Sequence, residues 1–160
     1  MENSERKKGF AGFTGLFKDS VADVPDGSKI AFTGSIGSCP PIAEMLAFAI
    51  RKREFELSYL PLANPAESRS MQWIEGLGFT MSVEKAEPSQ VDVLVVLGGL
   101  AMPNIGCPIE DVKVLVERLG SPRLIGIGFM DILNRTGWIE ELPFDVVING
   151  YIDAGVWSKG

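Results

Sequence analysis

Short unbroken apolar runs alternate along this chain with stretches whose apolar residues recur at helical spacing. The clearest run is Val93–Leu97, which is rich in β-branched residues, follows Asp92 and precedes Gly98 and Gly99. A strand without polar alternation is buried on both faces, as in a parallel sheet covered by helices. Short segments rich in apolar residues predict five further strands, at residues 29–33, 55–60, 79–83, 123–129 and 144–148.

Helical spacing of apolar residues separates most of these runs. It predicts helices at residues 10–24, 42–53, 67–77 and 109–119, and Pro108 suits the first position of the last of these. A short helix is expected after Asp131, which can cap it. Asn149-Gly150 is expected to turn the chain, so that Tyr151, Ile152, Val156 and Trp157 pack back onto the surface.

Strands that alternate with helices predict an α/β fold. We expect a three-layer Rossmann-like sandwich with a mostly parallel sheet of five to six strands. A chain of 160 residues is most simply one domain. Residues 1–8 are polar and are expected to form a flexible tail, which leaves residues 9–160 as the single domain.

Composition excludes several classes of function. The net charge of -6 argues against nucleic-acid binding, which needs a basic face. No apolar run is long enough to span a bilayer, and no signal peptide is visible, so we expect a cytoplasmic protein without a membrane partner. The chain has 0 histidines, which excludes catalytic pairs and metal sites that need one.

Two glycine-rich loops, after the first strand and after Val93–Leu97, lead into helices. Residues 36–42 resemble residues 105–109, because both place Cys-Pro shortly after Ile-Gly. Ligands of open α/β sheets bind at the carboxyl ends of the strands where the strand order reverses. In the commonest order the first and fourth strands flank that point, so the two loops are expected to face each other across one crevice. The candidate ligand-binding residues are Gly34, Ser35, Gly37, Ser38, Cys39, Gly98, Gly99, Asn104, Gly106, Cys107 and Asp131.

The expected ligand is a small anionic metabolite or nucleotide. Helix N-termini offer unpaired backbone N–H groups and a partial positive charge, which suit a phosphate or carboxylate. The alternative is that the glycines serve only the tight turns between strands and helices. For Asn104 and Asp131 the corresponding alternatives are a turn residue and a helix cap. Asp153 is a weaker candidate for the crevice.

The cysteines offer a second interpretation. A helix N-terminus lowers the pKa of a nearby thiol, so Cys39 and Cys107 are candidates for nucleophilic, redox or metal-binding chemistry, with Asp131 as a further catalytic candidate. Free cysteine also serves as a small buried apolar residue. Two thiols alone do not complete a metal site, so no metal site is assigned.

Known cofactor fingerprints are incomplete. The first loop does not reproduce G-x-G-x-x-G, and the second strand ends in Leu60-Pro61-Leu62-Ala63-Asn64 without an acidic residue for a ribose, which disfavours NAD. No G-x-x-x-x-G-K-[ST] occurs, which excludes a P-loop. The order of elements is similar to that of S-adenosylmethionine-dependent methyltransferases, but their carboxylate at the second strand is also missing. The cofactor stays unassigned.

At VLVVLGGLAMPNIGCPIEDVKVL and KIAFTGSIGSCPP, the sequence resembles a family of small archaeal proteins, prominent in methanogens, that is known only as a domain of unknown function. The resemblance covers most of the chain from Phe10 onward. It implies an archaeal cytoplasmic protein and carries no catalytic residues over. Three functions therefore stay open: a ligand-binding protein, a thiol-based redox or metal-binding enzyme, and a non-enzymatic subunit whose aromatic N-terminal helix and tail form the interface of a homodimer or larger homo-oligomer.

Overall fold

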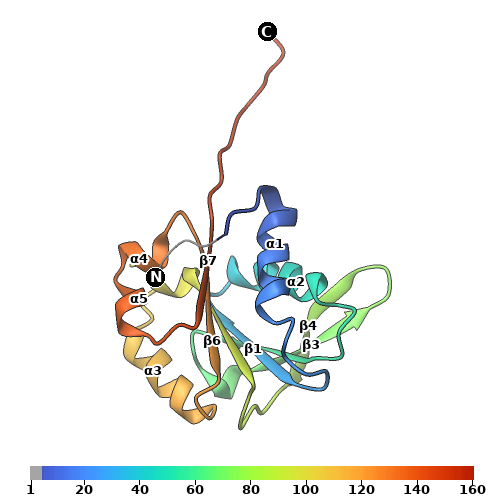
Figure 1. Cartoon of the computed structure of the whole chain (residues 1–160), viewed down its shortest axis with the longest axis vertical. Helices are drawn as coiled ribbons and strands as arrows, with labels where there is room; N and C mark the ends of the chain where they lie inside the picture. Colours follow the sequence, from blue (N-terminus) through green and yellow to red (C-terminus); the bar gives the residue numbers. More distant parts are fainter. Residues whose placement is uncertain (1–4) are drawn as a thin grey trace.

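A sheet of seven strands, in the order β4-β3-β2-β1-β5-β6-β7, runs through the computed structural model, which describes residues 5–160 (Figure 1). The strands are β1 (Lys29–Gly34), β2 (Glu56–Pro61), β3 (Arg69–Ile74), β4 (Gly78–Lys85), β5 (Val93–Leu97), β6 (Arg123–Phe129) and β7 (Val146–Gly150). The helices are α1 (Gly9–Ser20), α2 (Cys39–Ala49), α3 (Ile109–Arg118), α4 (Ile132–Arg135) and α5 (Trp138–Glu141), with 3-10 turns η1 (Pro65–Glu67) and η2 (Gly98–Ala101).

Five adjacent strands, β2, β1, β5, β6 and β7, are parallel. Their apolar runs are buried as expected, and β5 is buried at all five positions. The α/β class and the mostly parallel sheet are therefore confirmed. The expected strand count was too low, because β3 joins β2 in antiparallel register and forms a hairpin with β4.

The prediction of a helix at residues 67–77 was wrong. Met71, Ile74 and Leu77 have helical spacing, but only Met71 is buried, while Ile74 and Leu77 are 44% and 76% exposed. Trp73 pairs with Phe79 across the hairpin and packs edge-on against its ring. Cross-strand aromatic contacts of this kind favour strand over helix, and a single sequence does not reveal the partner strand.

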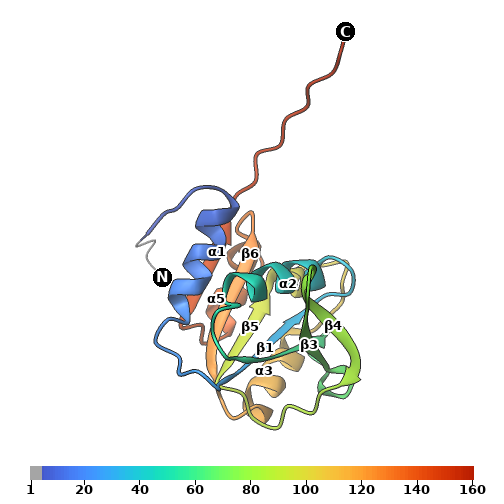
Figure 2. The ribbon, with the colours of Figure 1, turned by 90° about the vertical axis from the view of Figure 1, so that its right-hand side faces the viewer.

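Helices cover both faces of the sheet (Figures 1 and 2). One buried cluster joins α1 and α2 to the sheet through side chains such as Phe17, Phe32 and Leu46. The other joins α3, α4 and α5 to the opposite face through side chains such as Leu94, Leu115 and Trp138. No helix within residues 5–160 has the length and apolar content needed to cross a membrane.

The two ends of the chain were predicted to be a flexible N-terminal tail and a C-terminal segment that packs on the surface. The predicted tail at residues 1–8 falls partly on residues 1–4, which lie outside the described residues; residues 5–8 precede α1 without regular structure. Asn149 and Gly150 end β7 and do not form a turn. Residues 151–160 continue beyond β7 and project away from the body in both views, so the expected return of Val156 and Trp157 to the surface was wrong (Figures 1 and 2).

Candidate functional site

The reversal of strand order lies between β1 and β5. In chain order, the five parallel strands are arranged second, first, third, fourth and fifth, so that β1 and β5 are neighbours whose outward connections run in opposite directions. Thr33 of β1 is opposite Val96 of β5, which brings the loops after both strands to the same edge. This edge is the usual place for a ligand in an open α/β sheet.

The two glycine-rich loops touch at this edge. A Cβ atom added at Gly99 would lie 2.4 Å from Cys39 Sγ and 2.9 Å from Ser35 Oγ. Ser35 Oγ donates a hydrogen bond to Cys39 Sγ at 3.1 Å and lies 3.0 Å from Ser38 Oγ. Ser35, Ser38, Cys39 and Gly99 therefore form one cluster, whose exposed member is Ser38.

The second loop also touches the end of β6. A Cβ at Gly98 would lie 3.0 Å from Gly128 Cα and 2.5 Å from Ile132 Cγ2. The glycines of β6, which predict close packing on that strand, do have close neighbours: Gly126 faces Leu133 and Phe144. The pair Gly98-Gly99 thus contacts the loop after β1 on one side and the end of β6 on the other.

The end of β2 supports the first loop, which sequence reasoning missed. Thr33 Oγ1 donates to the Leu60 carbonyl at 2.8 Å and accepts from the Ala63 N–H at 3.0 Å. The Tyr59 hydroxyl donates to the Ser35 carbonyl at 2.6 Å. Burial raises the pKa of Tyr59, so it remains a neutral donor. A threonine inside an otherwise apolar strand was the available signal, because a buried hydroxyl needs a partner.

The helix N-termini offer fewer anion-binding groups than the sequence suggests. Helix α2 begins with Cys39, Pro40 and Pro41, and the two prolines have no N–H to donate. Helix α3 carries Glu110 and Asp111 in its first turn, where their negative charges offset the positive end of the helix dipole. Any anion at this edge must rely on hydroxyl, amide and loop N–H donors.

The two cysteines are free and belong to different packing clusters. Cys39 is 5% exposed and packs on the α1–α2 face, whereas Cys107 is half-buried on the α3 face, 3.9 Å from the Leu62 carbonyl oxygen. Burial and the charge of Asp111 raise the pKa of Cys107, against the expected lowering. Cys107 is therefore a protonated thiol at neutral pH.

The remaining predicted residues lie around the same edge. Asn104, Gly37 and Gly106 are exposed, and both glycines have positive φ, at +87° and +73°. Asp131 precedes α4 without a capping hydrogen bond; its N–H donates to Asn149 Oδ1 at 2.8 Å, and its carboxylate accepts from Asn134 at 3.1 Å. Asp153 lies in the exposed tail, outside this group.

Strained backbone gathers at this edge. Five non-glycine residues among residues 5–160 have positive φ, and four of them directly follow parallel strands: Leu62 and Ala63 after β2, and Met130 and Asp131 after β6. Such residues each cost about 1–3 kcal/mol and are commonest at functional sites. No group of three or more acidic or cysteine side chains within the described residues is arranged to hold a metal ion.

Comparison with known proteins connects the chain to archaeal relatives. An uncharacterised protein of Methanothermobacter thermautotrophicus is 37% identical over 98% of this chain and 98% of its own length. Uncharacterised protein MJ1183 of Methanocaldococcus jannaschii is 34% identical over 92% of this chain and 86% of its own. A crystal structure of a protein of unknown function from M. thermautotrophicus matches with a TM-score of 0.89 and 37% identity over 99% of both chains.

Residues 8–153 match the family described as an uncharacterised protein conserved in archaea, DUF2124. The match spans all of the strands and helices described above and both glycine-rich loops, in agreement with the resemblance seen at those loops. This chain is therefore a member of the DUF2124 family of uncharacterised archaeal proteins.

Proposed function

We propose that this protein binds a small anionic metabolite or nucleotide between the loops at residues 34–39 and 98–107. The observation that supports this most directly is the contact of Gly99 with Ser35 and Cys39 at the point where strand order reverses. Open α/β sheets bind their ligands at that point because both loops leave the sheet there in opposite directions.

The groups available to the ligand are polar and exposed. The Ser38 hydroxyl is exposed beside the buried Ser35 hydroxyl, and Asn104 is exposed in the second loop. Gly37 and Gly106 have positive φ and open space on the side where a Cβ would stand, so their main chain is accessible to a ligand.

A thiol reaction has less support. Cys39 is buried under Gly99, and the pKa of Cys107 is raised. The cysteines therefore enter the proposal as residues that shape the loops.

Ser38 offers a matched test. Ser38 makes no capping hydrogen bond to α2, so Ser38→Asp places a negative charge at the rim without removing a cap, whereas Ser38→Asn is similar in size to the aspartate and neutral. We expect AMP, ATP, ribose 5-phosphate or inorganic phosphate to raise the unfolding midpoint of the wild type and of Ser38→Asn. Ser38→Asp should weaken the same ligand at least ~10-fold, since a like charge beside a bound anion costs more than 1.4 kcal/mol.

Native mass spectrometry of freshly purified protein is the complementary measurement, because it reports a retained ligand directly. The proposal would be wrong if no ligand is retained and none of the four probes shifts the midpoint. It would also be wrong if Ser38→Asp binds as tightly as the wild type.

A further inference from the structure

The C-terminal tail, residues 151–160, carries apolar side chains that are exposed to solvent. The tail leaves the end of β7 and projects into solvent (Figures 1 and 2). Near its start, the Ile152 N–H donates to Met130 Sδ at 3.5 Å. Further along, Val156 is 90% exposed and Trp157 is 91% exposed. Large exposed apolar side chains grouped in one segment mark an interaction surface.

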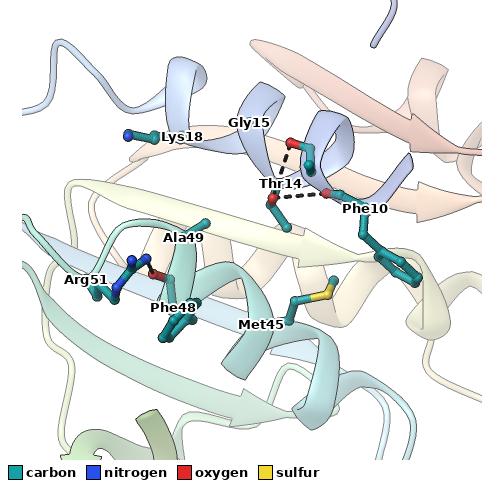
Figure 3. Close-up of a pocket in the computed structure, with 9 residues that line it drawn as sticks. Phe10, Thr14, Gly15, Lys18, Met45, Phe48, Ala49 and Arg51 are labelled. Carbon is teal, nitrogen blue, oxygen red and sulfur yellow. Dashed lines mark hydrogen bonds between the residues drawn. The ribbon is translucent and has the colours of Figure 1, made fainter. Parts of the chain in front are cut away.

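An apolar groove lies between α1 and α2. Its volume is about 430 Å³, and small residues, Ala11, Thr14 and Gly15, form its α1 wall. Met45, Phe48 and Ala49 form the α2 wall, with Phe10 at one end and Lys18 and Arg51 at the other (Figure 3). Phe10 is 61% exposed and Phe48 is 46% exposed, so the groove presents aromatic surface to solvent.

A smaller hollow extends this groove toward the β3–β4 hairpin. It measures about 290 Å³, shares Met45 and Phe48 with the groove, and reaches Leu77 and Phe79. Leu77 is 76% exposed. The two hollows therefore adjoin over α2, where the larger is mainly apolar and the smaller is also lined by Glu44.

The tail and the groove match in chemistry. Val156 and Trp157 supply aliphatic and aromatic surface for a groove walled by methionine and phenylalanine. Asp153 lies four residues before Trp157, roughly 13 Å in an extended chain. Phe10 and Lys18 are eight positions apart on α1, roughly 12 Å along the helix, so a tail laid along the groove with Trp157 against Phe10 brings Asp153 within reach of Lys18 at the cationic end.

The positions of the tail and the groove favour a second copy of the chain as the partner. Gly150, where the tail begins, lies against Phe13 on one side of α1, since a Cβ there would be 3.2 Å from the Phe13 ring. The groove lies on the side of α1 that faces α2, and the tail points away from it (Figures 1 and 2). An exchange in which each tail enters the groove of the other copy uses the same two surfaces on both copies and closes on itself.

We propose that two copies of this chain form a dimer by exchanging their C-terminal tails. Trp157 and Val156 of each copy fill the α1–α2 groove of the other, and Asp153 pairs with the cationic end of that groove. The dimer contact is separate from the ligand site at the carboxyl edge of the sheet, so each proposal can fail without the other.

Gly15 provides a test that does not disturb the fold. It is a helical residue around which an added Cβ meets no atom within 4 Å, so Gly15→Leu fills the groove and favours α1. We expect light scattering of the full-length wild type to give a dimer, and Gly15→Leu and Trp157→Ser each to raise the dissociation constant at least ~30-fold, as for a central aromatic anchor. Val114→Ser, at a 64% exposed site on α3, is the control and should leave the dimer unchanged.

Mixing the two variants tests the exchange itself. Gly15→Leu retains an intact tail and Trp157→Ser retains an open groove, so a mixture should form heterodimers held by one tail while each variant alone is monomeric. Charge reversal provides a second check: Asp153→Arg and Lys18→Asp should each weaken the dimer, and the double variant should recover it.

Three outcomes would overturn the proposal. The first is a monomeric wild type. This includes a monomer whose tail occupies its own groove, which the fluorescence difference between the wild type and Trp157→Phe would report as a buried Trp157. The second is a dimer that Gly15→Leu or Trp157→Ser leaves intact. The third is a mixture of the two variants that stays monomeric.

Discussion

Gly98 and Gly99 connect three strand ends through contacts that no larger residue allows. Gly98 faces Gly128 and Ile132 at the end of β6, and Gly99 faces Ser35 and Cys39 after β1. A Cβ built at either glycine would lie closer to these atoms than Cβ atoms normally lie to their neighbours. A methyl group at either position must therefore displace a packed atom. The geometry of the proposed ligand site therefore depends on the absence of two side chains.

A double-mutant cycle tests this contact. Gly99→Ala should destabilise the fold by about 1–3 kcal/mol, because the new methyl group overlaps Cys39 Sγ. Cys39→Ala removes that sulfur, and we expect the double variant to be more stable than the sum of the two single effects. Urea unfolding measures all three variants. Additive effects would mean that the two loops do not touch.

Ser68 has a buried hydroxyl group that destabilises the fold. Its side chain is 0% exposed, and its hydroxyl has no hydrogen-bond partner among the described residues. An unsatisfied buried hydroxyl costs about 1–3 kcal/mol, so Ser68→Ala should stabilise the fold by roughly 1 kcal/mol. Ser35→Ala is the control. Because the Ser35 hydroxyl donates to Cys39 Sγ, its removal should destabilise the fold. Chemical denaturation that ranks Ser68→Ala below the wild type would contradict this prediction.

At the scale of elements, the molecule consists of a parallel core and an antiparallel extension. Strands β1 and β5 are buried along almost their whole length, whereas β3 and β4 are mostly exposed or half-buried. The extension is held by the ladder with β2 and by aromatic contacts of Trp73 with Phe48 and Phe79. Few of its apolar groups are removed from water, so its local stability is lower than that of the core.

Hydrogen exchange should therefore separate the two parts. We expect the amides of β1, β5 and β6 to exchange through global unfolding and those of β3 and β4 to exchange earlier by local opening, since exposed hydrogen bonds with few buried contacts open first. Native-state exchange followed by mass spectrometry of peptides measures this order. Equal protection of β4 and β5 would show that hairpin and core unfold as one unit.

At the scale of the whole molecule, distant segments are joined by an ion pair. Asp23, which follows α1, accepts two hydrogen bonds from the Arg123 guanidinium at the start of β6, at 2.7 and 2.8 Å. Arg123 also donates to the Ser20 carbonyl at 3.1 Å. These contacts span about 100 positions of sequence and fix the end of α1 against the sheet.

This pair predicts a pH dependence of stability. Hydrogen bonding to Arg123 lowers the pKa of Asp23 from 3.8 to about 2 in the folded protein. The folded state binds fewer protons, so the stabilisation is present above the unfolded pKa of 3.8 and is lost as the pH falls through about 2. The stability gap between wild type and Asp23→Asn should therefore shrink over that interval.

Urea midpoints for both proteins at neutral pH and at several values below pH 4 provide the measurement. Because the pair is exposed, the effect should be small and should weaken with salt. Glu87→Gln, at an exposed position between β4 and β5, is the control and should follow the wild type. A gap that stays constant with pH would mean that Asp23 acts only through packing.

The sequence alone determined the elements whose pattern is local. The apolar run VLVVL identified β5 to the residue, and the run of leucine, isoleucine and glycine after Arg123 identified β6, because a strand buried on both faces carries few polar residues. The alternation of strands and helices predicted the parallel core, and the spacing of Gly98 and Gly99 after β5 located the loop that meets the first one. The family resemblance rested on the same loops.

Only the tertiary structure decided which distant residues meet. Residues 67–77 have helical spacing, yet strand pairing with β4 decides their conformation, and the support given by Thr33 and Tyr59 to the first loop depends on β2 lying beside β1. Burial outweighs the helix dipole at Cys107, and the tail finds no surface of its own to cover. Each of these outcomes depends on contacts between residues far apart in the chain, which periodicity and propensity do not encode.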